Sequence, residues 1–146
     1  MTEHPATTIR QAVAAAILAA GTDAGDRVYT GPVDPLDPGA LPVVAVFCVG
    51  SEYEGEAYID QPRAYRAALN LITVLWVQAS ATLYDELEEL ARQVRRAVQA
   101  DESQGGAAMD TVWAGEDLSL EEDGGVSLGQ MLINWRVGYI YHDTGA

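Results

Sequence analysis

The chain has 146 residues, of which 49% are apolar, and this predicts a single globular domain over residues 1–146. It carries 22 acidic and 8 basic residues, all eight of them arginines, for a formal net charge of −14. Because phosphate contacts need a basic face, this charge argues against sequence-specific nucleic-acid binding. The lone Cys48 excludes an intrachain disulfide framework, and no apolar run approaches the roughly 18 residues of a membrane-spanning helix, so we expect no membrane partner.

The first predicted element is a helix from about Thr8 to Ala20, because its apolar residues recur at helical spacing. Thr7 or Thr8 can cap its start, and Gly21 can end it. The stretch is alanine-rich, but an acidic leader and polar interruptions argue against a signal peptide. We therefore expect a structural helix in an intracellular protein.

A connection rich in Gly, Asp and Pro follows at residues 22–39, with a short candidate strand at 27–29. Asp34 and Asp37 in this connection indicate a turn rather than a cation site, because prolines surround them and further ligands are missing. Residues 41–49 then form a strand pattern that Gly50 is expected to break.

Residues 51–60 alternate acids with aromatic or small residues, which is typical of a solvated edge strand or hairpin tip. A carboxylate-rich catalytic loop is the alternative, although no histidine lies nearby in the sequence.

The strongest pattern in the chain is a long strand from Tyr65 to Gln78, with large apolar residues on both faces. Such a strand needs cover on both sides, so we expect it at the centre of a sheet or against a partner. Fully extended, it would span roughly 45 Å at about 3.3 Å per residue. A domain of this size is only about 38 Å across, so the strand must bend or reach the edge of the subunit.

A helix with one apolar stripe is predicted next, from Thr82 to Ala100. Thr82 and Asp85 have the spacing of a capping box, and Glu88 and Arg92 have the spacing of an i,i+4 ion pair.

Two more strands are predicted, at residues 109–120 and 131–141. Because the strands are grouped rather than alternating with helices, we expect an α+β fold. Its sheet would be largely antiparallel or mixed, with four to five strands and two α-helices packed on one face.

The sequence contains no phosphate-binding loop, dinucleotide fingerprint, nucleophile elbow or zinc-protease motif. Its two histidines, His4 and His142, lie near the termini. We therefore expect no enzymatic activity, with no catalytic, cofactor-binding or metal residues. A pair of catalytic carboxylates cannot be recognised from sequence, so a hydrolase remains an alternative.

Several segments, in the same order, resemble the phage minor tail protein U family, the lambda-type tail terminators. They are residues 9–13 (IRQAV), 41–47 (LPVVAVF), 50–56 (GSEYEGE), the long strand, 85–88 (DELE) and the closing strand at 135–141. The resemblance covers most of the chain but includes no catalytic signature. The connection at residues 22–39 departs most from the pattern.

The resemblance implies an α+β structural protein that forms a homo-hexameric ring. Such a ring caps the tail tube at its final length, stops tube polymerisation and offers a surface for joining the head. The implied partners are other copies of the chain, the tail tube protein and a head–tail connector protein. The implied location is the head-proximal end of the virion tail, after assembly in the host bacterial cytoplasm.

A ring needs a head-to-tail surface that closes on itself, and aromatic and arginine side chains on the long strands could supply one. The arginines could pair with acids of a neighbour, whereas the tryptophans could instead fill the subunit core. The interface candidates, for contacts between protomers or with the tube, are Arg63, Tyr65, Arg66, Trp76, Trp135, Arg136, Tyr139 and Tyr141. A small acidic inhibitor that mimics DNA, or another non-enzymatic interaction module, is the alternative function.

Overall fold

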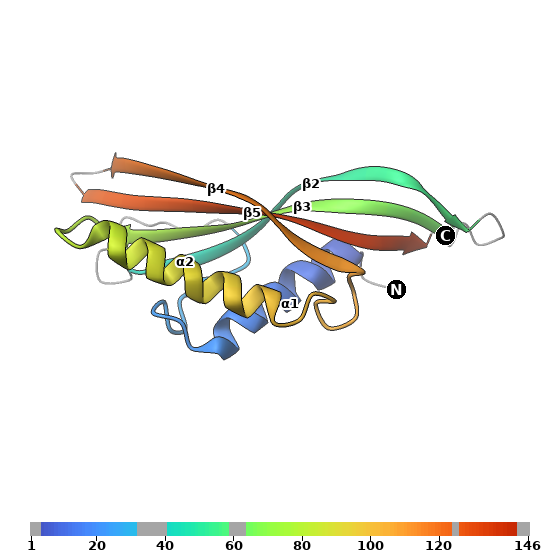
Figure 1. Ribbon diagram of the computed structural model, residues 1–146, viewed down its shortest axis with the longest axis horizontal. Helices are drawn as coiled ribbons and strands as arrows, with labels where there is room; N and C mark the ends of the chain where they lie inside the picture. Colours follow the sequence, from blue (N-terminus) through green and yellow to red (C-terminus); the bar gives the residue numbers. More distant parts are fainter. Residues whose placement is uncertain (1–3, 32–40, 59–63, 124–125, 143–146) are drawn as a thin grey trace.

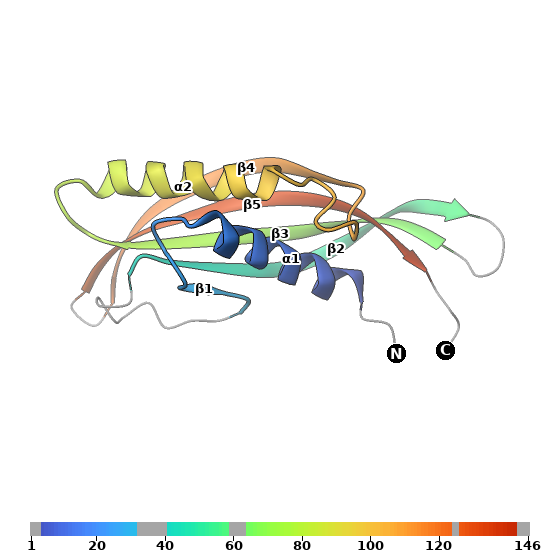
Figure 2. The ribbon, with the colours of Figure 1, turned by 90° about the horizontal axis from the view of Figure 1, so that it is seen from below.

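The computed structural model describes residues 4–31, 41–58, 64–123 and 126–142. Five strands form one sheet in the order β1-β2-β3-β5-β4, and both helices cover the same face of it (Figures 1 and 2). The predicted α+β fold is confirmed. In chain order the elements are α1 (Pro5–Ala20), β1 (Val28–Tyr29), β2 (Val43–Tyr58), β3 (Ala64–Gln78), α2 (Leu83–Gln99), β4 (Asp110–Asp123) and β5 (Val126–His142).

The sheet is mixed, because β1 pairs with β2 in parallel whereas all other neighbours are antiparallel. The long predicted strand is β3, and it lies in the middle, between β2 and β5. Its side chains are buried on both faces, as Leu75 on the helix side and Trp76 on the opposite side illustrate. The expectation of a central strand is therefore confirmed, and side chains on both of its faces are buried between Val74 and Val77.

The strand predicted at 41–49 and the edge strand predicted at 51–60 are one continuous strand, β2. Gly50 does not end it. Instead the pairing with β3 shifts register between Cys48 and Gly50, and Gly50 adopts a φ of 155°. A bulge of this kind absorbs an extra residue and bends the strand without breaking the ladder. The turn expected around Asp34 and Asp37 lies outside the described residues.

Helix α1 begins earlier than predicted, and neither Thr7 nor Thr8 is its N-cap. The chain enters the helix through Pro5, whose missing N–H costs nothing in the first turn. The His4 Nδ1 atom accepts a hydrogen bond from the Ala6 N–H at 3.0 Å. The predicted end is confirmed, since Gly21 has a φ of 66° and its N–H donates to the Leu18 carbonyl.

Helix α2 has the predicted apolar stripe, but its polar contacts differ from the sequence pattern. Thr82 occupies the N-cap position without a capping hydrogen bond from its side chain, whereas the Ser80 hydroxyl donates to Glu86 at 3.1 Å. Arg92 pairs with Glu89 at i,i+3 instead of Glu88 at i,i+4. Both spacings place side chains on one face of a helix, so the sequence alone could not choose between them.

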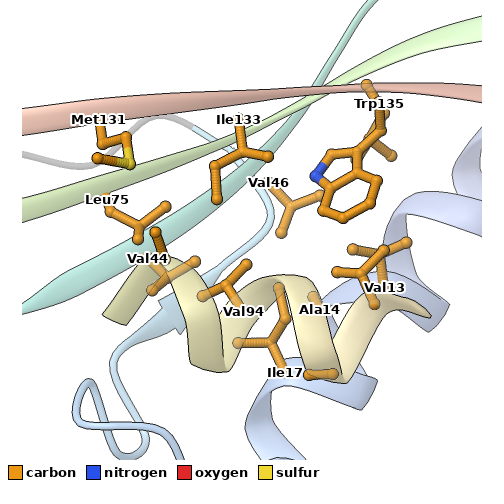
Figure 3. Packing of buried hydrophobic residues seen from close by; sticks show 14 of the residues in the cluster. Val13, Ala14, Ile17, Val44, Val46, Leu75, Val94, Met131, Ile133 and Trp135 are labelled. Atoms are coloured by element: carbon orange, nitrogen blue, oxygen red, sulfur yellow. The ribbon is translucent and has the colours of Figure 1, made fainter. Parts of the chain in front are cut away.

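The main core lies between the sheet and the two helices (Figure 3). Trp135 is its largest side chain and is only 1% exposed. A smaller cluster occupies the opposite face of the sheet, where it consists of Val43, Ala45, Val74, Trp76 and Leu128. Residues around the main core come from both helices and three strands, and Figure 3 labels Val13, Ala14, Ile17, Val44, Val46, Leu75, Val94, Met131, Ile133 and Trp135.

The sheet is longer than the helix layer that covers it. At one end β2 and β3 run on past both helices, and β5 stays paired with β3 as far as Ala64 (Figures 1 and 2). We call the last paired residues of β2 and β3, Tyr53–Tyr58 and Ala64–Arg66, the arm. It agrees with the expectation that the long strand reaches the edge of the subunit.

Candidate functional site

The arm presents two tyrosines and an arginine beyond the helix layer. Tyr53 and Tyr65 come from its two strands and pack edge to face, with ring centroids 5.8 Å apart. Tyr53 is 66% exposed, although a large aromatic side chain has a strong tendency to be buried. Arg66 is also exposed and forms no ion pair with another described residue. Tyr65 and Arg66 thus remain interface candidates, whereas Arg63 lies outside the described residues.

Arg136 is already engaged within its own chain. From β5 it reaches across β3 to two acids of β2, Glu52 at 3.0 Å and Glu54 at 2.7 Å. The short Ala68 side chain on β3 stands opposite Glu52 in the register and leaves room for this crossing. The hydrogen bonds that Arg136 donates to Glu54 and then to Glu52 raise the pKa of Arg136. The positive charge of Arg136 is therefore balanced by two glutamates of its own subunit. A contact between Arg136 and a neighbouring subunit stays a prediction.

The two candidate tyrosines of β5 lie beside the start of α1. Tyr139 is buried, and its hydroxyl donates to Ser51 Oγ at 3.1 Å. Tyr141 is partly exposed and stacks on His4 with centroids 5.1 Å apart. Of the pair, only Tyr141 offers surface to a partner.

Both candidate tryptophans are buried within the subunit, which favours the core interpretation. Trp135 belongs to the main core, and its indole N–H donates to Thr73 Oγ1 at 3.2 Å. Trp76 belongs to the smaller cluster on the opposite face. A contact with a neighbour would require either side chain to leave this packing.

The most exposed apolar strip was not among the sequence candidates. It lies along β4, the last strand of the sheet, and consists of Trp113 (46% exposed), Leu118 (46%) and Leu120 (59%). These three residues pair with Trp135, Met131 and Gly129, which places them on the helix-covered side of the sheet. Periodicity showed that β4 carries apolar residues, but only the tertiary structure shows that α2 leaves them uncovered.

A groove of about 500 Å³ runs between α2 and β4 beside this strip. Arg95 crosses it, forming a close ion pair with Glu116 while its guanidinium lies 5.2 Å from the centre of the Trp113 ring. This contact combines an ion pair with a cation–π interaction and fixes α2 over the strand. The lining residues are Asp85, Glu88, Glu89, Ala91, Arg92, Arg95, Glu116 and Met131.

The described residues contain no cluster of three or more histidine, cysteine or acidic side chains arranged to bind a metal. Burial raises the pKa of the half-buried Cys48 thiol, against a smaller lowering by Arg10. In the described part of the chain, neither helix combines the length and apolarity required to cross a bilayer. The surface features that stand out in the described part of the chain are the arm, the strip and the groove.

No family model matches the sequence, and no curated protein matches it. Among solved structures, the chain is similar to one described as "Virion of native gene transfer agent (GTA) particle", with 13% sequence identity and a TM-score of 0.45. The match covers 94% of this chain and 99% of that chain.

Proposed function

We propose that this chain is a structural subunit of a phage tail and has no catalytic role. In this proposal copies of it close into a hexameric ring that caps the head-proximal end of the tail tube. The ring stops further addition of the tube protein and presents a surface to a head–tail connector protein. The resemblance in the sequence suggested this role, and the surface of the fold supplies a physical basis for it.

The observation that carries the proposal is the open edge formed by β4. This strand has 14 residues, no described strand pairs with its outer side, and apolar side chains are exposed along it. A long edge strand with exposed apolar residues is an aggregation hazard in a monomer, and proteins normally cover or charge such edges. Six of the fourteen β4 residues are acidic, so this edge is charged, and a role in assembly would explain the apolar residues exposed between the acids.

The other edge of the sheet is also largely open. The two-residue β1 pairs with β2 only at Val44 and Ala45, so no described strand covers the rest of that side of β2. The two edges differ in sequence and shape, and contacts between unlike surfaces are head-to-tail. Such contacts generate a ring when the rotation between neighbours closes.

Two measurements test the proposal. Light scattering over a range of concentrations, with and without tail tubes, should detect a six-subunit species. Tubes polymerised from the cognate tube protein should stop growing when this protein is added. A protein that stays monomeric and leaves tube growth unchanged would show the proposal to be wrong.

A DNA-mimic inhibitor is the competing function, and one feature favours it. The first turns of α2 expose Asp85, Glu86 and Glu88 on a chain with a net charge of −14. An inhibitor of this kind would bind a basic DNA-binding enzyme as a monomer or dimer. Co-purification with such an enzyme, together with failure to cap tubes, would favour this second function.

A further inference from the structure

The outer edge of β4 has an unpaired backbone. β4 pairs with β5 on one side, and no described strand pairs with it on the other side (Figure 1). On such an edge every second residue directs its N–H and C=O groups outward, where they can bind an added strand. The backbone of β4 is therefore suited to an occupant in the extended conformation.

On the helix side of the sheet, β4 offers apolar side chains to such an occupant. Leu118 pairs in register with Met131 of the main core, and Leu120 follows Leu118 on the same face of the strand. These two leucines are 46% and 59% exposed. Burying apolar surface is favourable, so large apolar side chains of an added strand would be stabilised against them.

On the opposite side of the sheet, β4 carries unpaired acids. Asp117 pairs in register with Leu132, which packs against the smaller cluster on this face, and Asp110 lies opposite Gly138. Both aspartates are exposed, and neither forms an ion pair with another described residue. β4 contains no basic residue. An added strand would therefore be stabilised by basic side chains on this face.

A second copy of this chain does not offer a strand of this kind among its described residues. β3 and β5 are paired on both sides, so only β1, β2 and β4 have a free edge. β1 has two residues, and β2 has three acidic residues and no basic one. Arg136 of β5 offsets only one of these charges. Because β4 is also acidic, charge complementarity selects a different protein as its partner.

We propose that the β4 edge binds an extended segment of a different protein, in which basic residues alternate with large apolar residues. The segment adds a sixth strand to the sheet, with its apolar residues on Leu118 and Leu120 and its basic residues facing Asp110 and Asp117. Main-chain hydrogen bonds supply affinity in this mode of binding, and the alternating side chains supply specificity. The inference deepens the proposed function and rests on it in taking this edge as an assembly surface. Contacts between copies then use the remaining surfaces, including the free edge of β2.

A synthetic peptide that alternates lysine with valine is the probe for this site. Added to the intact chain, it should bind and slow hydrogen exchange at alternate amides of β4, as measured by NMR, while exchange in β2 stays unchanged. The same peptide with every amide N-methylated keeps its charges but cannot donate main-chain hydrogen bonds, so it should bind at least severalfold more weakly. A glutamate–valine peptide should not bind. Equal binding of the N-methylated peptide, or binding without protection of β4, would overturn the inference.

Substitutions on β4 give a second readout. Asp117→Arg should weaken binding of the lysine–valine peptide severalfold, because it replaces an attraction with a repulsion. Leu118→Ser should also weaken binding, because it removes apolar contact area. Asp26→Arg is the matched control, since Asp26 is equally an exposed acid but precedes β1 at the other edge of the sheet. Equal weakening by Asp117→Arg and Asp26→Arg would show that the peptide responds to net charge alone, and it would refute the site.

Three outcomes separate this inference from the proposed function. A protein that caps tubes but does not bind the peptide would retain the function and refute the β4 site. Protection of β4 that rises with protein concentration, without peptide, would mean that a second copy occupies the edge and would refute the inference but not the ring. A protein that binds the peptide at β4 but leaves tube growth unchanged would support the site and refute the tail-capping role.

Discussion

The indole N–H of Trp135 donates to the hydroxyl of Thr73 at 3.2 Å, in the middle of the main core. The two residues lie on neighbouring strands, β5 and β3, and face the helices. Thr73 is fully buried, and Trp135 is the most buried tryptophan of the chain. Because the Thr73 hydroxyl accepts its hydrogen bond, the indole N–H of Trp135 is not left unpaired in the core.

The first prediction follows from this bond. Thr73→Val keeps the shape of the side chain but leaves the Trp135 N–H buried without its partner. The free energy of unfolding should fall by about 1–3 kcal/mol. In a Trp135→Phe background the same substitution should cost much less, because no donor is left unsatisfied, and urea unfolding of the four proteins measures the difference. Equal losses in both backgrounds would show that the hydrogen bond is not the cause.

The second prediction concerns the close approach of α2 to β5. A Cβ atom added at Gly129 would lie 2.4 Å from Leu83 Cδ1 and 2.8 Å from Leu87 Cδ1. Gly129→Ala should therefore push α2 away or force new rotamers, at a cost of about 1–3 kcal/mol. Gly138→Ala on the same strand is the control, since nothing lies within 4 Å of its added Cβ and it should be neutral or slightly stabilising. Comparable denaturation midpoints for the two variants would refute the packing argument.

The third prediction concerns the end of α2. Gln104 is buried in a left-handed conformation with a φ of 47°, and its amide donates to the Val98 carbonyl and to Thr111 Oγ1, each at 3.1 Å. Gln104→Ala should cost about 1–3 kcal/mol, because it removes both bonds inside the core. Gln104→Gly removes the same bonds but tolerates the positive φ, so it should be about 1 kcal/mol more stable than the alanine variant.

Exposed Gln99 on α2 offers a control, since Gln99→Ala should leave the unfolding free energy nearly unchanged. If Gln104→Ala were as stable as Gln104→Gly, strain at this position would not contribute to stability.

The fourth prediction concerns pH. Hydrogen bonds from Arg92 and then Gln93 lower the pKa of Glu89 from an ordinary 4.5 to about 2. Because the folded-state pKa lies below the unfolded value, the stabilising contribution is present above about pH 4.5 and is lost as the pH falls toward 2. Carboxyl-carbon NMR should show Glu89 titrating near 2 in the wild type and closer to its ordinary value in Arg92→Gln.

The stability difference between wild type and Arg92→Gln should accordingly shrink between pH 5 and pH 2. The pair is solvent-exposed, so high salt should reduce the effect. An unchanged Glu89 titration in the Arg92→Gln protein would assign the low pKa to another cause.

Several features could be predicted from local pattern. The apolar residues of β3 on both faces predicted a central, doubly covered strand, and the stripe of α2 predicted a helix that packs on the sheet. Gly21 predicted the end of α1, because glycine readily adopts the left-handed conformation that ends a helix. Spacing and residue type alone determine these features, so neighbours along the chain suffice to reveal them.

Other features depended on contacts between distant segments. A glycine such as Gly50 can end a strand or form a bulge. Here β2 stays paired with β3 on both sides of Gly50, so the strand continues through a bulge. Arg136 could have faced a neighbour, but Glu52 and Glu54, more than eighty residues earlier, pair with it. Leu118 on the edge strand β4 remains 46% exposed, which no local pattern encodes.

The sequence by itself therefore determined which segments become helices and strands, and it suggested a structural protein by resemblance. Only the tertiary structure decided which apolar side chains are buried and which charged side chains are paired inside the subunit. The others stay exposed on its surface. The physical reason is that periodicity assigns a residue to a face of its element. Whether that face is covered depends on where a distant element packs.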